Sequence, residues 1–535
     1  MRWPGKRHLW ATLLALTLLV ALLAGCGGGA KAPSGGQATP ATPPAKKTDA
    51  VVAIGGDAVS LDPHDTNDNL SYGIENTIYE GLVGFDKDMK VIPVLAESWT
   101  ASDDAKTFTF KLRQGVKFHT GEDLNAAAVK KSFLRVADPN NKLKRNSLFA
   151  NIASIDTPDQ YTVVFHLKEP FGAMLYNFAH PAGKVIAPSG IDKGKEELAR
   201  NPKYGTGPFM FKEWVANDHI TVVKNPNYWN KDGMAKVNSI TFKPITEAST
   251  RVAGLKTGAL DFALPIPGTD AIALKSDPNV KVSASKSIYS FYIAMNVTKK
   301  PYSDKRVREA MNLAIDREAL RKGVLRGFAD PATSVIAPDV SFYVKQGDEI
   351  KRDVAKAKEL LKQAGYPDGF ETEMWFSNLT ERKDLAAAIQ QQLAEVGIKV
   401  KLVPMDNASL ASNLWTQDKE HAKVQLYMGG WSPSTGDADW AIRPLLYGEM
   451  APPKGYNVGF YDNPKVNELI KAGLATADPK KRAEVYAELQ KVIWEDKPWV
   501  FLFVPQNLSA SGAKVTGVFV QGDGIVNYNA ISFTD

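Results

Sequence analysis

The sequence has almost no cysteine and little histidine. Cys26 is the only cysteine among 535 residues, which excludes a disulfide framework within the chain. The histidines that follow the N-terminal segment are isolated from one another, so no metal-binding spacing is present. They are His64, His119, His166, His180, His219 and His421. We therefore expect no bound metal ion and no cofactor.

Motifs that carry catalytic chemistry are also missing. The sequence contains no His-Glu-x-x-His, no Gly-x-Ser-x-Gly, no Gly-x-x-x-x-Gly-Lys and no Cys-x-x-Cys. The net charge of +6 is small for this length, and no sustained basic run occurs. We therefore expect neither an enzyme nor a nucleic-acid-binding protein.

Long apolar runs are confined to the N-terminus. Arg2, Lys6 and Arg7 precede an apolar run at residues 9–24 that is too short for a comfortable membrane span. This pattern predicts a signal peptide over residues 1–25. No later stretch is apolar enough to cross a membrane, so the chain after about residue 50 is expected to be a soluble, exported protein.

The end of this segment resembles a lipid-attachment site. Residues 23–26 read Leu-Ala-Gly-Cys, which is similar to the lipobox of bacterial lipoproteins, whose thiol carries a diacylglycerol. We therefore expect lipidation at Cys26 and a location on the outer face of the cytoplasmic membrane, or in the periplasm. Residues 27–49 are rich in glycine and proline and cannot bury a core, which predicts a flexible tether after the lipidated Cys26.

The remaining part of the chain is long enough for more than one core. About 485 residues follow the tether, which favours at least two lobes. Strand-like and helix-like patterns alternate from end to end. Residues 108–112, 161–167 and 220–223 predict strands, and Asn125 predicts the start of a helix over residues 126–136.

The second half predicts a βαβ unit and further helices. A strand at 371–376, a helix at 380–396 and a strand at 398–403 follow one another. Asp478-Pro479 is a strong start for a helix that ends near residue 495, and an apolar strand follows at 499–504. We expect two α/β lobes, with the chain crossing between them near Met295-Asn296 and near Val504-Pro505, where turn chemistry follows β-rich runs.

Several stretches resemble a known family. Residues 93–99 read Pro-Val-Leu-Ala-Glu-Ser-Trp, and residues 107–118 continue Thr-Phe-Thr-Phe-Lys-Leu-Arg-Gln-Gly-Val-Lys-Phe. Together they resemble the signature of family 5 extracellular solute-binding proteins, which bind peptides and nickel chelates. Further matching stretches lie at residues 60–64, 205–209, 307–316 and 364–370.

The resemblance implies a fold and a division of the chain. The fold is α/β, a two-lobed type II periplasmic-binding-protein-like fold with an extra subdomain inserted in lobe I. The expected division is lobe I at 50–296 with the subdomain at about 91–210, lobe II at 297–503, and a return to lobe I at 504–535. The implied partners are a short peptide ligand and the ABC permease subunits in the membrane, with a monomeric receptor.

Three stretches resemble the glutathione-binding receptors of this family, namely residues 430–440, 142–145 and 262–267. In the receptors of this family that bind ordinary dipeptides and oligopeptides, the corresponding stretch has Gly-Trp and then, three residues after the Trp, an aspartate that pairs with the ligand amino group. This chain has Ser434 at that place. The departure favours glutathione or another γ-glutamyl peptide. The alternatives are ordinary di- or oligopeptides, a nickel chelate or haem.

A short peptide brings charges of both signs, and burying each charge without a partner costs several kcal/mol. For the ammonium, Asp437 is the first candidate and Asp439 the second. The alternative is that an aspartate caps the helix that begins near Trp440. The same loop is expected to contribute further ligand contacts. These are Gly430, Trp431, Ser432 and Ser434.

For the ligand carboxylates we expect arginine, because a guanidinium binds a carboxylate through two parallel hydrogen bonds. The candidates are Arg145, Arg251 and Arg382, each of which is equally explained by a surface ion pair. The family places ligand contacts after the first strand, which implies roles for Asn69, Ser71 and Tyr72. The alternative for these three is helix capping and packing.

Overall fold

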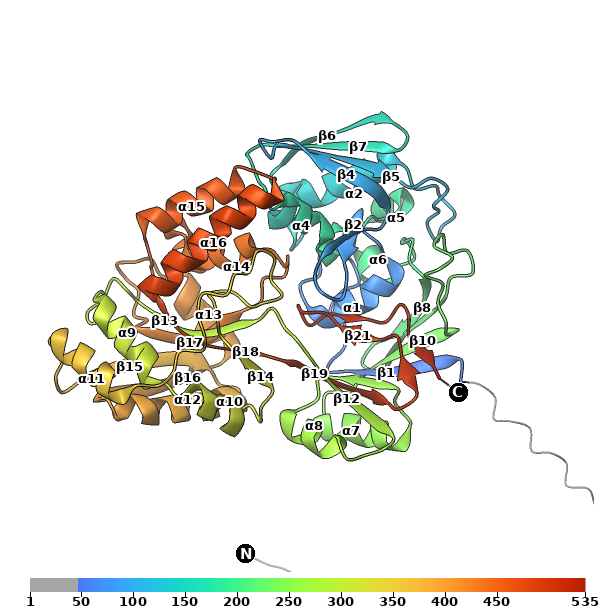
Figure 1. The fold of residues 1–535 in the computed structure, drawn as a ribbon. Coiled ribbons are helices and arrows are strands. Elements are labelled where there is room, and N and C mark those ends of the chain that lie inside the picture. Colours follow the sequence, from blue (N-terminus) through green and yellow to red (C-terminus); the bar gives the residue numbers. More distant parts are fainter. Residues whose placement is uncertain (1–46, 535) are drawn as a thin grey trace, which may run out of the picture. The chain divides into compact units, whose positions relative to one another are not determined.

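Three large β-sheets organise residues 47–534, the part of the chain that the computed structural model describes (Figure 1). The predicted signal peptide, Cys26 and almost all of the predicted tether lie outside this part. The first sheet has seven strands, β1 (Asp49–Ile54), β8 (Phe209–Val215), β9 (His219–Lys224), β10 (Ser239–Pro244), β11 (Phe262–Leu264), β12 (Val280–Ser285) and β19 (Asn507–Gly512). In space they follow the order β12-β19-β11-β1-β10-β9-β8.

The second sheet has six strands and is covered by helices on both faces. Its strands are β13 (Ser290–Met295), β14 (Ala329–Pro331), β15 (Phe370–Ser377), β16 (Ile398–Met405), β17 (Leu426–Trp431) and β18 (Trp499–Pro505), in the order β14-β18-β13-β17-β15-β16. Along β13, Phe291 and Ile293 enter one apolar core, whereas Tyr292 and Ala294 enter another. This alternation follows from the period of two in a strand and produces a sheet buried on both faces.

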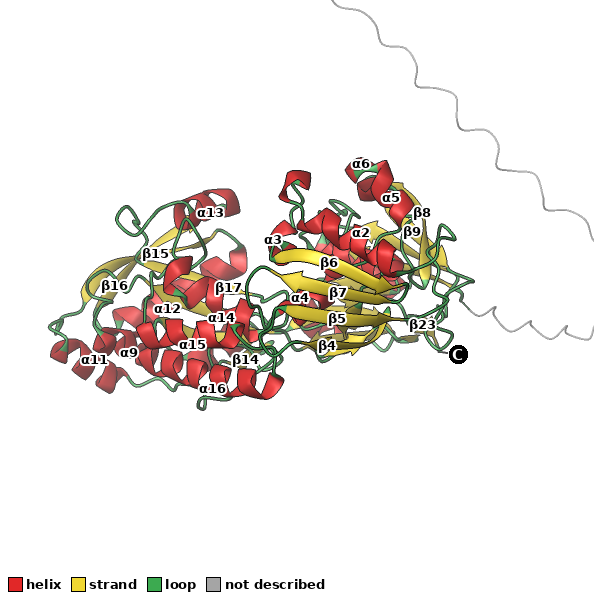
Figure 2. Cartoon of the chain, turned by 90° about the horizontal axis from the view of Figure 1, so that it is seen from above, coloured by secondary structure: helices red, strands yellow, loops and turns green. Residues whose placement is uncertain are grey.

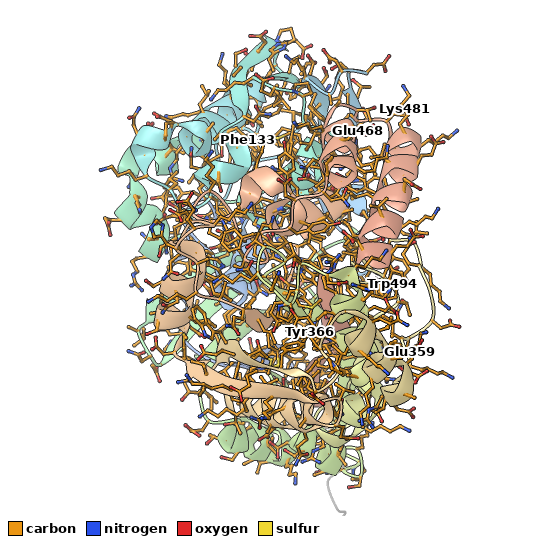
Figure 3. The ribbon with its side chains drawn as sticks, turned by 90° about the vertical axis from the view of Figure 1, so that its left-hand side faces the viewer. Phe133, Glu359, Tyr366, Glu468, Lys481 and Trp494 are labelled. Atoms are coloured by element: carbon orange, nitrogen blue, oxygen red, sulfur yellow. The ribbon has the colours of Figure 1, made fainter. Side chains whose placement is uncertain are left out.

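The helices that cover the six-stranded sheet divide between its two faces. One core is completed by α9 (Lys305–Ala314), α10 (Arg317–Gly323), α11 (Val354–Gln363) and α12 (Thr380–Ala394). The other is completed by α13 (Asn407–Trp415), α14 (Ala438–Leu446), α15 (Pro464–Leu474) and α16 (Pro479–Asp496). The helices α15 and α16 lie side by side, with Glu468 and Lys481 exposed (Figure 3). Trp494 at the end of α16 is buried and stacks on Phe501 of β18.

The third sheet has four antiparallel strands and its own core. Its strands are β4 (Ala96–Ala101), β5 (Thr107–Leu112), β6 (Ile152–Asp159) and β7 (Thr162–Leu167), in the order β4-β5-β7-β6 (Figure 2). Phe133 of α2 (Ala126–Ala137) and Phe178 of α4 (Met174–Ala179) pack against it, with ring centroids 5.1 Å from Phe165 and 5.0 Å from Phe110. This sheet lies within the residues for which an inserted subdomain is expected.

The remaining elements of the described residues are short. The helices are α1 (Asn69–Ile78), α3 (Asn146–Phe149), α5 (Pro188–Lys193), α6 (Lys195–Arg200), α7 (Ala248–Thr257) and α8 (Gly268–Leu274), with 3-10 turns at Pro139–Asn141, Pro181–Gly183 and Gly448–Met450. Three two-stranded ribbons are formed by β2 (Val83–Phe85) with β3 (Val91–Pro93), β20 (Val515–Thr516) with β23 (Ser532–Phe533), and β21 (Phe519–Val520) with β22 (Val526–Asn527).

The chain connects the two larger sheets twice. It leaves the seven-stranded sheet after Ser285, enters the six-stranded sheet at Ser290, and returns between Pro505 and Asn507. The first connection comes before the crossing expected near Met295-Asn296, because β13 pairs with β17 and β18. We call residues 47–285 and 507–534 lobe I, and residues 290–505 lobe II.

The predicted secondary structure agrees closely with these elements where its signals are local. Asn125 accepts a hydrogen bond from the backbone N–H of Ala128 and caps α2, and Asp478 caps α16 with Pro479 at its first position. The predicted βαβ unit is present as β15, α12 and β16, with the two strands parallel. None of the helices within residues 47–534 combines the length and the apolar character that crossing a bilayer requires.

Candidate ligand-binding cleft

A cavity of about 800 Å³ has walls from both lobes. In lobe I, Gly55 follows β1, and residues 264–268 lie at and after the end of β11. In lobe II, Glu381 and Arg382 begin α12 just after β15, and Ser432 follows β17. The strand β1 is parallel to β11, and β15 is parallel to β17. The cavity therefore lies at the carboxyl ends of parallel strands in both lobes, where open α/β sheets bind their ligands.

Both connections between the lobes also line this cavity. The first contributes Ser287 and Tyr289, and the second contributes Pro505 and Gln506. A molecule in the cavity contacts lobe I, lobe II and the segments that join them. Any rotation of one lobe against the other therefore changes the contacts of a bound molecule.

Arg382 is the cation of the cavity wall. Its side chain is 18 % exposed, and the guanidinium carbon lies 4.1 Å from the ring centroid of Phe291. Its Nη1 is buried and has no hydrogen-bond partner among the described residues, which costs about 1–3 kcal/mol. Glu381 lies 3.8 Å away, but it is 57 % exposed, so solvent screens this pair. The stacked guanidinium is thus held ready for an anion.

Two tyrosines stand beside Arg382. Tyr289 lies with its ring centroid 6.0 Å from the guanidinium carbon, and burial raises the pKa of its phenol. Burial likewise raises the pKa of Tyr427, while Arg382 acts in the opposite direction. Both phenols therefore stay neutral at physiological pH, and neither neutralises the guanidinium.

Lobe I contributes a carboxyl group to the same cavity. Asp523 is 7 % exposed, and its Oδ1 accepts a hydrogen bond from the backbone N–H of Ile525 at 2.9 Å. The backbone carbonyl of Asp523 accepts a hydrogen bond from Nδ2 of Asn69 at 2.8 Å. Burial raises the pKa of Asp523 to about 7. The cavity thus has Arg382 and the exposed Glu381 on lobe II and the buried carboxyl group of Asp523 on lobe I.

Of the twelve ligand-binding residues expected from the sequence, three line the cavity: Asn69, Arg382 and Ser432. Arg382 is there because the βαβ unit places the start of α12 at the end of β15. Asn69 is the first residue of α1, whose N-terminus meets the segment around Asp523. These three sites come from segments far apart in the sequence.

Ser71, Tyr72 and Arg145 support the wall behind Asn69. Ser71 is buried, and its Oγ accepts a hydrogen bond from the backbone N–H of Val59. The hydroxyl of buried Tyr72 donates to the carbonyl of Thr66 at 2.6 Å and accepts from Nε of Arg145 at 2.7 Å. This arrangement is the packing that the sequence left open as the alternative for Ser71 and Tyr72.

Arg251 is buried against backbone carbonyls. Its guanidinium donates hydrogen bonds to the carbonyl oxygens of Pro265, Ile245 and Thr246, at 2.6 to 3.1 Å. Pro265 lines the cavity. Arg251 therefore braces the loop after β11, and its hydrogen-bond donors already have partners within the protein.

Asp437 and Asp439 are buried and paired with arginines inside lobe II. Asp437 binds Arg482 through two hydrogen bonds of 2.8 Å, and Arg443 binds Asp439 at 2.8 to 3.0 Å. Asp437 also caps α14 by accepting the backbone N–H of Asp439. The structure therefore gives Asp437 the capping role that was the alternative, because a buried carboxylate requires a nearby cation and hydrogen-bond donors.

The loop after β17 contributes mainly packing. Trp431 donates a hydrogen bond from Nε1 to the carbonyl of Trp440 at 2.7 Å, and its ring lies 5.2 Å from that of Tyr456. A side chain at Gly430 would place Cβ 2.5 Å from the carbonyl oxygen of Ser290. Ser434 is half-buried outside the cavity lining.

Sequence reasoning missed Asp523 and the residues of the two connections. Asp523 stands in a Gly-Asp-Gly turn, and nothing local separates a turn aspartate from one that faces a cavity. Tyr289 and Gln506 line the cavity only because the chain crosses between the lobes there. Within residues 47–534, no group of three or more His, Cys, Asp or Glu side chains is arranged to hold a metal ion.

Comparisons with known proteins point to one family. The model of the bacterial extracellular solute-binding proteins, family 5 Middle, matches residues 90–451. The glutathione-binding protein GsiB of Salmonella typhi is 43 % identical over 476 residues, which cover 89 % of this chain and 92 % of that protein.

Solved structures share the fold. HbpA2 from Haemophilus parasuis superposes with a TM-score of 0.81 at 26 % identity, covering 91 % of this chain and all of that one. The periplasmic binding protein DppA from Helicobacter pylori, solved with the peptide STSA, superposes with a TM-score of 0.74 at 28 % identity. The match covers 92 % of this chain and 99 % of DppA.

Proposed function

Because this chain belongs to family 5 of the bacterial extracellular solute-binding proteins, we propose that it captures glutathione or another γ-glutamyl peptide for an ABC importer. The predicted two-lobed type II periplasmic-binding-protein fold is confirmed by its structural neighbours. Its relatives are substrate-binding receptors, so the chain is a receptor and not an enzyme.

The observation that carries the proposal is the half-buried guanidinium of Arg382 in a cavity between two lobes, where its one ion-pair partner among the described residues, Glu381, is largely exposed. A ligand carboxylate can pair with the part of the guanidinium that is open to the cavity, because the side chain is 18 % exposed. The cavity volume of about 800 Å³ lies within the usual range for small-molecule sites. A tripeptide is therefore a suitable occupant.

Two further observations favour a γ-glutamyl ligand. Relatives that are 41–43 % identical over most of the chain are named for glutathione binding. Receptors for ordinary peptides have an aspartate at the position that Ser434 occupies in this chain. A γ-linked glutamyl unit carries its ammonium and a carboxylate on a side branch, so its ammonium needs a partner at a different place in the cleft.

Capture requires no covalent step. A ligand that contacts Arg382 from lobe II and the loop after β11 from lobe I favours the arrangement in which both walls touch it. Release returns the peptide unchanged to the permease. Asn69 and Ser432 complete the proposed contacts.

We also propose that the receptor is attached to the outer face of the cytoplasmic membrane through Cys26. The lipobox-like Leu-Ala-Gly-Cys and the glycine- and proline-rich stretch after it support this location. Two acyl chains give firm attachment, where a single chain gives only marginal binding. Labelling with a radioactive fatty acid is expected to mark the wild type, and Cys26→Ala should lose the label and appear in the soluble fraction.

Isothermal titration calorimetry tests the choice of ligand. The titrants are reduced glutathione, oxidised glutathione, γ-glutamylcysteine and the ordinary tripeptide Glu-Cys-Gly with an α-linkage. We expect glutathione to bind at least ten times more tightly than the α-linked tripeptide, about 1.4 kcal/mol. The α-linked isomer is the matched control, since it differs from glutathione only in the position of one peptide bond.

The opposite ranking would contradict the γ-glutamyl assignment while leaving the peptide receptor intact. Saturable binding of a nickel chelate or haem with no heat from any peptide would overturn the proposed ligand class.

A further inference from the structure

Asp523 differs from every other buried aspartate among residues 47–534. Five of the six buried aspartates have a cation within pairing distance. These pairs are Asp62 with Arg135, Asp65 with Lys195, Asp261 with Lys47, Asp437 with Arg482, and Asp439 with Arg443. Asp523 has no such partner in the part of the chain that the structure describes, and it lines the cleft. Folding therefore leaves this aspartate without the cation that a buried carboxylate requires. Buried Glu75 and Glu80 also have no ion pair among the described residues, but they accept side-chain hydrogen bonds and do not line the cleft.

The geometry of Asp523 leaves one oxygen free for a ligand. Its Oδ1 accepts the backbone N–H of Ile525, which fixes the orientation of the carboxyl group. Its Oδ2 has no hydrogen-bond partner within residues 47–534. The flanking Gly522 and Gly524 also line the cavity and place no side chain in front of the carboxyl group. A cationic group of a ligand can therefore approach Oδ2.

No group around Asp523 in the described part of the chain is a cation that pairs with its carboxyl group. Gly524 lies between Asn69 of α1 and Asn507 of β19, which are uncharged. Asp68, which precedes Asn69, is itself an acid, and Lys286 lies 3.5 Å from Asp339. Glu381 and Arg382 line the cavity from lobe II, and Tyr289 follows Ile288, whose backbone N–H donates a hydrogen bond to the carbonyl of Gly522. No lysine or arginine of the described residues neutralises this carboxyl group.

We propose that Asp523 binds the ammonium group of the ligand. In receptors for ordinary peptides this role belongs to an aspartate at the position that Ser434 occupies here. The inference rests on the proposed function, because it assigns the ammonium partner of the same peptide. It defines the ligand class as a zwitterion whose ammonium reaches the Gly522–Gly524 turn of lobe I and whose carboxylate reaches Arg382 of lobe II. Binding such a ligand bridges the two lobes through opposite charges.

The proposal implies a definite pH dependence. Burial raises the pKa of Asp523 to about 7 in the free receptor, and a bound ammonium lowers it. As the pH falls below about 7, the carboxyl group has to lose a proton before it binds the ammonium. Affinity therefore decreases by up to about tenfold per pH unit below that value, and it levels off above it.

The test compares two ligands and two variants by calorimetry. The ligands are reduced glutathione and its des-amino analogue glutaryl-cysteinyl-glycine, which lacks only the ammonium. Asp523→Asn keeps an oxygen that accepts the N–H of Ile525. Asp277→Asn is the matched control, because Asp277 accepts the backbone N–H of Asn279, also two residues later, at 2.9 Å in a solvent-exposed hydrogen bond. We expect Asp523→Asn to weaken glutathione binding by roughly 10- to 100-fold and to leave the analogue unchanged.

The outcomes separate this inference from the proposed function. Equal losses for both ligands, or no loss for glutathione, would overturn the role of Asp523 while the receptor for glutathione stands. Absence of glutathione binding by the wild type would overturn the proposed function and this inference with it. If Asp523→Asn does not fold, a pH series on the wild type decides: an affinity for glutathione that does not change between pH 5.5 and 8 contradicts the proposal.

Discussion

At the scale of single residues, the cleft depends on the contrast between paired and unpaired charges. Asp437 is matched by a buried arginine inside lobe II, and Arg251 is surrounded by backbone carbonyls. Arg382 and Asp523 line the cavity, where Arg382 has only the exposed Glu381 at 3.8 Å and Asp523 has no cation partner among the described residues. A buried charge without a partner destabilises the protein by itself, so its presence on a cavity wall indicates a ligand of opposite sign.

Arg382→Lys is expected to weaken glutathione binding by roughly tenfold or more. Lysine keeps the charge, but it loses the two parallel hydrogen bonds to a carboxylate and the flat contact with the ring of Phe291. Calorimetry measures the affinity, and a thermal melt shows whether the variant is folded. Arg306→Lys is the control, because Arg306 is exposed and pairs only with Asp304. Equal affinities for Arg382→Lys and the wild type would remove Arg382 from the site.

At this scale, a residue's position can be predicted where it follows from local order. Arg382, one of three arginines expected to bind ligand carboxylates, lies in the cavity lining because it is near the start of a helix directly after a strand of the βαβ unit. The partner of Asp437 was not predicted, because Arg482 lies 45 residues later and only the packing of α14 and α16 around α15 brings them together. Asp523 was missed for the same reason, since its neighbour Asn69 is 454 residues away.

At the scale of elements, helix starts both stabilise lobe II and shape the cleft. Asp437 begins α14 and Thr380 begins α12, and the two helices follow strands whose carboxyl ends point toward the cavity. The start of α12 places Arg382 in the cavity lining. The start of α14 is instead buried, because its cap, Asp437, also pairs with Arg482 of α16. Similar local signals therefore serve binding at one helix and stability at the other.

Asp437→Ala is expected to lower the free energy of unfolding by about 3–5 kcal/mol, because it leaves the guanidinium of Arg482 buried, at 2 % exposure, without its carboxylate. Urea denaturation followed by circular dichroism measures the change. Asp478→Ala is the control, since Asp478 caps α16 through solvent-exposed hydrogen bonds and its loss costs about 1 kcal/mol. A stable Asp437→Ala variant with much weaker ligand binding would return Asp437 to the ligand site.

The elements themselves were largely predictable. Caps such as Asn125 and Asp478, and the alternation of Phe108 and Phe110, act within a few residues, so one sequence reveals them. The sheet to which β13 belongs was harder to predict from the sequence. Its partners β17 and β18 lie more than a hundred residues later, and an apolar strand fits either sheet. The expected crossing near Met295-Asn296 therefore came one strand too late.

At the scale of the whole molecule, the two lobes also touch away from the cavity. Gly172 of lobe I donates a backbone hydrogen bond to the carbonyl of Leu474 in lobe II at 2.8 Å. The ring of Tyr176 lies 6.3 Å from that of Phe342, and the ring of Phe171 lies 5.7 Å from the guanidinium carbon of Arg443. These contacts hold the lobes together on a second surface. We therefore expect closure over a ligand to depend on this surface as well as on the cavity.

Gly172→Ala is expected to weaken glutathione binding several-fold. An added Cβ would lie 1.9 Å from the carbonyl oxygen of Thr476, so the lobes have to move apart at this contact. Overpacking of this kind costs about 1–3 kcal/mol. Gly323→Ala is the control, because no heavy atom lies within 4 Å of its Cβ position. Calorimetry gives the affinity, and X-ray scattering gives the ligand-induced change in radius of gyration. Wild-type values in both measurements would show that this contact does not contribute to closure.

The central claim is that one small zwitterionic peptide is held between Arg382 of lobe II and the Asp523 segment of lobe I. A crystal structure of the receptor grown with reduced glutathione tests it most directly. The account predicts density for the peptide in the cavity, with one carboxylate in bidentate contact with Arg382 and the ammonium within hydrogen-bond distance of Asp523. Glutathione bound outside this cavity, or bound inside it with Arg382 contacting no carboxylate, would contradict the account.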